Sequence, residues 1–174
     1  MPVARSEQRY PAQRLTRIAG ALLDAAPLCA IATVTRTGRA YVNTAYFAWS
    51  PRFEIVWLSA PEARHSRNLE RQRSAAIAVF DTHQTWGGRD RGIQLFGTAS
   101  EARGTAKRDG ERLYARRFKQ YDPGSLEAYR LYRFRPRTVK LFHEQLLGGG
   151  TFVTARVDTT GRLRWMRTEV YEAD

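Results

Sequence analysis

Apolar residues near the start of the chain recur with the period of an α-helix. Spacings of three and four residues place one apolar stripe on a single face, made of Leu15, Ile18, Ala19, Leu22 and Leu23. Pro27 follows directly and disfavours further helical turns. The pattern therefore predicts a helix over residues 14–26 that packs one face against the remainder of the protein.

After Pro27 the apolar pattern becomes that of β-strands. Strands are expected at residues 28–35, 40–49, 53–59, 74–82, 92–100, 129–134, 138–144, 152–158 and 162–170. Two further helices are expected at 61–72, with Pro61 as first residue, and at 105–121, with Leu113, Tyr114 and Phe118 facing inward. Because strands mostly follow strands directly, we expect a mainly β fold, an antiparallel barrel with peripheral helices.

Composition narrows the class of protein. A length of 174 residues with 43% hydrophobic residues suits one domain over residues 1–174 with its own core. The single cysteine, Cys29, excludes a disulfide within the chain, and no His-rich spacing predicts a metal site. Apolar runs are too short for a membrane helix and residues 1–13 are unlike a secretory signal, so we expect a soluble cytoplasmic protein.

Charge raises the question of an anionic partner. The formal net charge is +12, and 26 of the 29 basic residues are arginine. The excess is spread along the chain, with +4 in residues 1–60, +6 in 61–120 and +2 in 121–174. A diffuse excess makes a nucleic-acid partner an unfavoured alternative and leaves two explanations open, namely arginine-rich coding bias and a real anionic ligand.

Three basic residues stand where a helix dipole disfavours positive charge. Arg64, His65 and Arg67 fall in the first turns of the helix expected at 61–72. A phosphate bound to the free backbone N–H groups would explain them, whereas the alternative is an ordinary solvated helix face.

Four motifs in order resemble the pyridoxamine-phosphate-oxidase-like FMN-binding split barrels. They are Ala32-Thr33-Val34-Thr35-Arg36-Thr37-Gly38-Arg39, Asn43-Thr44-Ala45-Tyr46-Phe47, Ala63-Arg64-His65-Ser66-Arg67-Asn68-Leu69 and Ile93-Gln94-Leu95-Phe96-Gly97-Thr98-Ala99. The resemblance covers about 110 residues and loosens after Tyr129. It implies an antiparallel split β-barrel, a homodimer with the flavin at the subunit interface, and FMN as cofactor.

The same resemblance implies an FMN site residue by residue. Arg64 and His65 match the family's phosphate cations, with His65 in place of the usual lysine and Arg67 as a candidate to compensate. Ser59, with Leu58 beside it, matches the strand end that reaches the phosphate. Asn43, Thr44 and Ala45 match the strand that lines the ring and ribityl chain, and Gln94 matches a contact to the ring edge. No catalytic residue is assigned.

The function that follows is an FMN-dependent oxidoreductase acting on a small organic substrate. Binding of haem or a deazaflavin, and a flavin-binding module without turnover, are the alternatives. The chain's end, residues 169–174, lacks the pattern of the true oxidase, so the vitamin B6 substrate is not transferred. Trp86, in the loop at 83–91 with Arg89 and Arg91, is a candidate substrate contact or part of a plain surface loop. Tyr129, Tyr132 and Phe134 are candidates for the dimer interface or for contact with the flavin ring, and the alternative for them is core packing.

Overall fold

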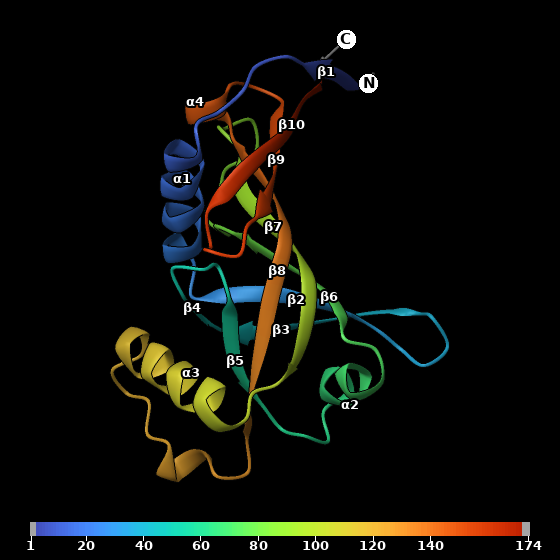
Figure 1. Cartoon of the computed structure of the whole chain (residues 1–174), viewed down its shortest axis with the longest axis vertical. Coiled ribbons are helices and arrows are strands. Elements are labelled where there is room, and N and C mark those ends of the chain that lie inside the picture. Colours follow the sequence, from blue (N-terminus) through green and yellow to red (C-terminus); the bar gives the residue numbers. More distant parts are fainter. Residues whose placement is uncertain (1–2, 172–174) are drawn as a thin grey trace. The chain divides into compact units, whose positions relative to one another are not determined.

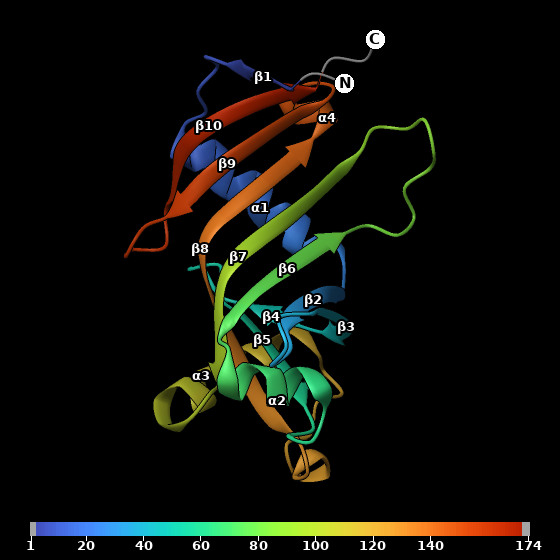
Figure 2. The same ribbon diagram turned by 90° about the vertical axis from the view of Figure 1, so that its right-hand side faces the viewer.

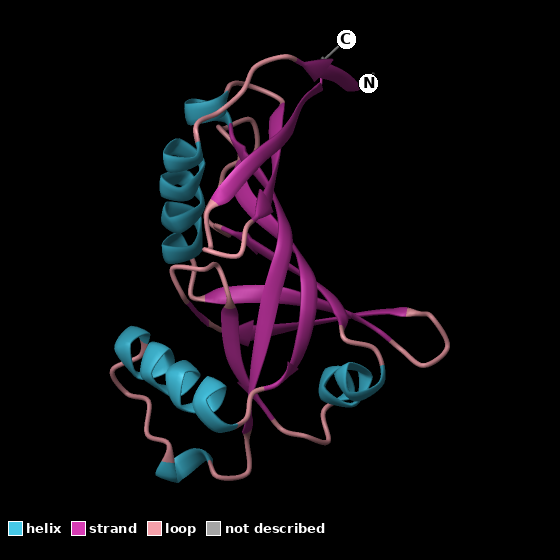
Figure 3. Ribbon diagram, viewed as in Figure 1, coloured by secondary structure: helices cyan, strands magenta, loops and turns pink. Residues whose placement is uncertain are grey.

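The structure is a computed structural model that describes residues 3–171. Residues 1–2 and 172–174 of the expected domain lie outside it, and 172–174 are the last three residues of the segment 169–174 discussed above. The described strands are β1 (Val3–Ser6), β2 (Leu28–Val34), β3 (Ala40–Tyr46), β4 (Ala48–Trp49), β5 (Ile55–Ser59), β6 (Ser74–Phe80), β7 (Arg91–Glu101), β8 (Arg130–His143), β9 (Thr151–Val157) and β10 (Leu163–Tyr171). The helices are α1 (Ala12–Ala25), α2 (Arg64–Arg71), α3 (Gly104–Arg117), α4 (Glu144–Leu147) and the 3-10 turn η1 (Gly124–Leu126). The expected mainly β fold with peripheral helices is confirmed (Figure 3).

The described chain divides into two compact units. Unit 1 comprises the described parts of Met1–Ala26, Ala78–Leu95 and Arg137–Asp174, and unit 2 comprises Pro27–Ile77 and Phe96–Pro136. Strands β6, β7 and β8 each contribute residues to both units. That residues 1–174 form a single domain stays a prediction.

The strands of unit 1 lie side by side in the order β1, β10, β9, β8, β7 and β6. The pairs β1–β10, β10–β9 and β9–β8 are antiparallel. Helix α1 lies beside β10 (Figures 1 and 2). The residues it buries are those of the predicted stripe, Leu15, Ile18, Ala19, Leu22 and Leu23, so the periodicity located this helix and its buried face correctly. Burying each such leucine or isoleucine stabilises the fold by roughly 1.5–3 kcal/mol.

Unit 2 continues the pairing through β8, β7, β6, β2 and β3, which leaves β3 at an edge. β2 and β3 are antiparallel with Leu28 opposite Tyr46, and β5 pairs with both β4 and β8. α2 packs on β2, and α3 packs on β4 and β5 (Figure 1). The largest fully buried side chains of this unit include Trp57, Phe47 and Phe134.

Two predicted boundaries are wrong for local reasons. The strand expected at 40–49 breaks into β3 and β4 at Phe47, whose ring is fully buried and whose backbone N–H donates to the carbonyl of Pro27. The helix expected from Pro61 begins at Arg64 instead, because Pro61 lies in a turn that the Ala63 N–H closes on the Ala60 carbonyl. β1, α4 and η1 were not predicted, since each spans only three or four residues and carries little periodicity.

The strands expected at 129–134 and 138–144 are one strand, β8, which runs through Pro136 without a break. A proline has no N–H to give to a strand neighbour, which is why a break was expected. Gly97 on β7 lies against this point, and a Cβ there would meet the carbonyl of Arg135 and come within 2.9 Å of the Pro136 Cα. A residue without a side chain therefore lets the two backbones approach closely.

We expect Gly97→Ala to destabilise the protein, because the obstructing atoms belong to the backbone and cannot rotate away. The free energy of unfolding should fall by roughly 1–3 kcal/mol, the usual cost of overpacking. Urea unfolding followed by circular dichroism measures it. Gly149→Ala is the control, since a Cβ at Gly149 meets nothing within 4 Å. Equal stability of the two variants would show that Gly97 does not set the approach of β7 to β8.

Candidate functional site

A cavity of about 670 Å³ opens in unit 2, within the size range of small-molecule and cofactor sites. Its wall is formed by β3, the end of β5, the start of α2, the end of α3 and the segment that follows α3. The lining residues are Asn43, Thr44, Ala45, Tyr46, Leu58, Ser59, His65, Tyr114, Phe118, Gln120, Tyr121, Leu126 and Tyr129. Six of the nine predicted cofactor-binding residues thus line one cavity, namely Asn43, Thr44, Ala45, Leu58, Ser59 and His65.

One end of the cavity is polar and hydrogen-bonded internally. Ser59 Oγ lies 2.6 Å from His65 Nε2, and Ser66 Oγ donates to Ser59 Oγ at 3.2 Å and to the Ala60 carbonyl at 2.8 Å. All three side chains are buried. Burial lowers the pKa of His65, so the imidazole is neutral at pH 7. The hydrogen bond between His65 Nε2 and Ser59 Oγ joins the imidazole to the neighbouring hydroxyl groups.

The start of α2 borders this polar end and favours an anion. Ala63 caps the helix without a side-chain hydrogen bond, and no acidic residue stands in the first turn. The first backbone N–H groups of a helix have no carbonyl partner within it, so they and the helix dipole attract negative charge. Asn68 ties the helix to the sheet, because its side-chain amide donates to Thr33 Oγ1 at 3.0 Å. The helix start is therefore held beside the cavity by a buried contact.

The opposite wall is aromatic, and it is the part of the site that the sequence did not reveal. The rings of Tyr46 and Phe118 meet edge to face at 5.8 Å, and Tyr114 contacts Phe118 at 4.7 Å and Tyr121 at 5.1 Å. The Tyr114 hydroxyl donates to the Tyr46 carbonyl, and burial raises the pKa of Tyr114 to about 12. The sequence predicts Tyr114 and Phe118 only as part of the buried face of a helix over 105–121. That boundary is wrong, because α3 ends at Arg117, and Phe118 and Tyr121 follow it. This wall suits a flat apolar ring system.

Asn43 supplies an unused polar group on β3. Its Oδ1 is buried and has no hydrogen-bond partner among the described residues, while its Nδ2 reaches the Thr44 carbonyl only at 3.5 Å. A buried acceptor without a donor costs about 1–3 kcal/mol. A ligand carrying an N–H or O–H group would relieve that cost.

Three predicted residues do not line the cavity. Arg64 and Arg67 are exposed in the first turn of α2, next to His65 but directed outside the lining. Gln94 lies half-buried on β7 and belongs to unit 1. Their assignment to the cofactor stays a prediction.

Among the other candidates, Tyr132 and Phe134 are buried core residues, and Tyr132 stacks on Trp57 with ring centroids 5.7 Å apart. Tyr129 differs, because it precedes β8, is exposed and lines the cavity. Cys29 is buried, and burial raises the pKa of its thiol to about 12, so it is an inert small hydrophobic residue.

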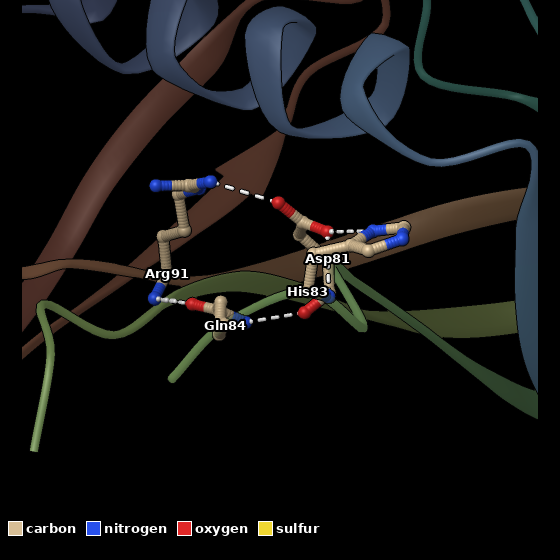
Figure 4. Close-up of polar contacts among 4 residues, drawn as sticks. All are labelled: Asp81, His83, Gln84 and Arg91. Atoms are coloured by element: carbon tan, nitrogen blue, oxygen red, sulfur yellow. Dashed lines mark hydrogen bonds and ion pairs between the residues drawn. The ribbon is translucent and has the colours of Figure 1, made fainter. Parts of the chain in front are cut away.

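The loop that carries Trp86 is fixed at its base in unit 1. Asp81 accepts from the His83 backbone N–H at 2.9 Å and from Arg91 Nη2 at 2.8 Å, and Gln84 bridges the Asp81 carbonyl and the Arg91 N–H (Figure 4). The backbone N–H of His83 and the Arg91 guanidinium hold the pKa of Asp81 below its usual range. Trp86 itself is fully exposed. Arg91 is therefore engaged in holding the loop rather than offered to a substrate.

Neither a membrane-spanning helix nor a metal-binding group of acidic, His or Cys residues occurs within residues 3–171. The mainly antiparallel sheet with its peripheral helices is the architecture of the split β-barrel proteins. A model of the family described as pyridoxamine 5'-phosphate oxidase matches residues 15–143. The chain belongs to this family, as its motifs indicated.

Solved structures of similar fold carry different descriptions. A heme binding protein from Mycobacterium smegmatis is 17% identical with a TM-score of 0.65, over 88% of this chain and 61% of that chain. A protein related to general stress protein 26, of the pyridoxinephosphate oxidase family, from Clostridium acetobutylicum is 12% identical with a TM-score of 0.65, over 86% and 98%. An F420 reductase is 20% identical with a TM-score of 0.53, over 68% and 93%. These likenesses concern the fold, and no curated protein sequence matches the chain.

Because the pKa of His65 is lowered in the folded protein, the free energy of unfolding should decrease at acidic pH. The folded protein binds the His65 proton less tightly than the unfolded chain, whose histidine titrates near pH 6.5. Below that pH the unfolded state gains protons, so the free energy of unfolding should fall as pH decreases from 7 to 5. His65→Gln should reduce this fall. Urea unfolding at both pH values measures it.

His143 is the control for this measurement, because burial also lowers its pKa and it lies outside the cavity lining. His143→Gln should remove its own separate contribution and leave that of His65 in place. An unchanged pH dependence in His65→Gln would contradict the assignment of a buried neutral imidazole at this position.

Proposed function

We propose that the protein binds FMN in the cavity of unit 2 and acts as a flavin-dependent oxidoreductase on a small organic substrate. The observation that carries the proposal is the cavity itself, which has an aromatic wall on one side and an anion-favouring helix start on the other. FMN combines a flat ring system with a terminal phosphate, so its two ends match the two ends of the site.

The residues have separate tasks in this proposal. Tyr46, Tyr114 and Phe118 offer the apolar surface for the ring, and Asn43 Oδ1 offers an acceptor to a ring N–H. Thr44 and Ala45 bring the β3 backbone to the ring and ribityl chain, and Leu58 is a further contact from β5. The bound flavin supplies the redox chemistry, and the protein supplies position and a dry environment for it.

The phosphate end is assigned to Ser59, His65 and the first turn of α2. A phosphate there accepts from backbone N–H groups, and its charge attracts Arg64 and Arg67 from the same turn. The phosphate also favours the charged form of His65, opposite to the effect of burial, so binding should be accompanied by uptake of a proton. Since His65 stands where the family usually has lysine, affinity for the phosphate should weaken as pH rises.

We further propose that two copies of the chain build the complete site. β3 is an edge strand of unit 2, and its exposed face carries Val42, Tyr46 and, on the paired strand, Leu28, with 60%, 57% and 44% of their surface exposed. Apolar side chains gathered beside a cavity opening fit a contact with a second copy. Such a contact would also cover the flavin.

Val42→Glu tests the dimer, because a charge in the centre of that face opposes its burial. We expect the native protein to elute as a dimer and Val42→Glu to shift to a monomer in light scattering coupled to gel filtration. Phe80→Glu, at an exposed apolar residue of β6, is the matched control and should remain a dimer. A native monomer, or an equal shift in both variants, contradicts the assignment of this face.

The visible spectrum of the purified protein tests the cofactor. We expect absorption bands of an oxidised flavin, FMN as the mass of the released chromophore, and reduction of the bound flavin by a chemical reductant. A Soret band would instead assign haem, the ligand in the description of the Mycobacterium smegmatis protein, and a deazaflavin mass would assign the cofactor named for the F420 reductase. A colourless protein that takes up no added FMN contradicts the proposal. If FMN is bound but the protein turns over no reductant, the protein is a flavin-binding module without catalytic activity.

Arg64→Ala tests the placement of the phosphate. Loss of one charged contact should weaken FMN binding about tenfold and leave the fold intact. Arg71→Ala, in the last turn of the same helix, is the control and should bind FMN as the native protein does. Fluorescence titration of the apoprotein measures both, and equal affinities would place the phosphate elsewhere.

A further inference from the structure

A second concave region of unit 2 shares no lining residue with the cofactor cavity. It consists of two cavities, of about 560 Å³ and 250 Å³, that have Ala106 and Arg133 in common. The larger is lined by Ser50, Pro51, Arg52, Glu54, Val56, Ala106, Asp109, Gly110, Arg112, Leu113, Arg116 and Arg133. The smaller is lined by Arg73, Thr98, Ala99, Ser100, Glu101, Ala102, Arg103, Ala106, Arg133 and Arg135. We call the two together the arginine groove.

The groove concentrates arginine beyond the composition of the chain. Seven of its twenty lining residues are arginine, against 26 in 174 overall. The lining holds only three carboxylates. The groove therefore concentrates positive charge, whereas the excess of basic residues is otherwise spread along the chain.

The carboxylates of the groove are already engaged. Glu54 forms a half-buried ion pair with Arg133 and has Arg135 at 3.9 Å, so one negative charge serves two arginines. Asp109 pairs with Arg112, and Glu101 with Arg103 at 3.2 Å. That leaves three lining arginines with no carboxylate partner in the described chain, namely Arg52, Arg73 and Arg116.

The fold holds these like charges close together at a cost. Arg112 and Arg116 are four residues apart on α3 and share a helix face, where like charges destabilise by a few tenths of a kcal/mol. Arg133 and Arg135 are two residues apart on β8 and share a face of the sheet. The ion pair with Glu54 fixes the Arg133 guanidinium at the junction of the two cavities. An anion in the groove would offset the repulsion.

We propose that the arginine groove binds a small polyanion that carries two or more linked phosphoryl groups. Guanidinium groups pair with phosphate oxygens through two parallel hydrogen bonds, which makes arginine suited to this ligand. Positive groups line both cavities on either side of Arg133, so a ligand that spans them requires more than one anionic group. The volumes fit a small molecule.

The lining also distinguishes this ligand from a nucleic acid. Binding of single strands relies on several aromatic side chains that stack on the bases. The two cavities have no aromatic lining residue, and the cavity that adjoins the smaller one has only Tyr132, which stacks on Trp57. The hydroxyl groups of Ser50, Thr98 and Ser100 supply further donors to phosphate oxygens instead. Recognition therefore rests on the phosphoryl chain, as a free polyphosphate or as part of a nucleotide.

Calorimetric titration with tripolyphosphate, ADP and orthophosphate tests the proposal on the native protein in its cofactor-bound form, as purified. We expect tripolyphosphate to bind, with affinity that falls as salt is added, and orthophosphate to bind much more weakly. ADP binding as tightly as tripolyphosphate would assign a nucleotide, and tripolyphosphate binding alone would assign the free polyphosphate. Absence of binding by both overturns the proposal.

The double variant Arg52→Gln/Arg116→Gln locates the site. Both side chains are exposed and without a carboxylate partner in the described chain, so the fold should persist while tripolyphosphate affinity falls roughly tenfold to a hundredfold. Arg36→Gln/Arg39→Gln, in the exposed turn between β2 and β3, removes the same charge elsewhere in unit 2 and should bind normally. Equal losses in both variants would show nonspecific attraction to net charge and overturn the proposal.

Two further measurements separate the outcomes. FMN retention should be unchanged in Arg52→Gln/Arg116→Gln, because neither residue lines the cofactor cavity, so the two sites succeed or fail independently. A single-stranded oligonucleotide should compete poorly with tripolyphosphate. Tighter binding of the oligonucleotide, lost in the same variant, would assign the groove to nucleic acid and contradict a small-molecule site.

Discussion

The close approach of β7 and β8 at Gly97 is the constraint on which the rest of the structure depends. It lets β8 continue through Pro136 as one strand of 14 residues. The first part of this strand pairs with β5 and its last part with β9. The β5 pairing in turn places Ser59 opposite Arg130 at the strand end, directly before the turn into α2. The polar end of the cofactor cavity is thus positioned by a backbone contact far from it in the sequence.

The alternating sides of the same strand serve different purposes. Tyr132 and Phe134 fill the core, whereas Arg133 and Arg135 face the arginine groove. Leu131 packs with Val56, Ala102 and Tyr114 beneath α3, the helix whose end forms the aromatic wall. Two regions of opposite chemistry, one largely aromatic and one cationic, therefore share a single rigid support. Positioning by strands and helices rather than by loops favours defined geometry at both.

How far the sequence predicts this protein depends on whether the signal is local. The α1 stripe and most strands follow from periodicity within single segments, and the family resemblance marked six residues that line one cavity. The join of β8 across Pro136 was missed because it depends on Gly97, a residue almost 40 positions away. The aromatic wall and the arginine groove were missed for the same reason, since each gathers residues from several elements. The arginines of the groove come from all three thirds of the chain, so a sum of charge over each third does not detect them.

The loop between β6 and β7 has a construction that lets its tip vary in sequence and length. Asp81, Gln84 and Arg91 close the loop at its base. Next to Arg91, the Glu144 backbone N–H donates to the Asp90 carbonyl, and the Asp90 N–H donates to Glu144 Oε2. At the tip, Trp86 is fully exposed and a Cβ at Gly87 would meet nothing within 4 Å. Lengthening or rewriting the tip costs little free energy, because loop closure depends only weakly on length. The tip can therefore change in length and sequence without loss of the fold.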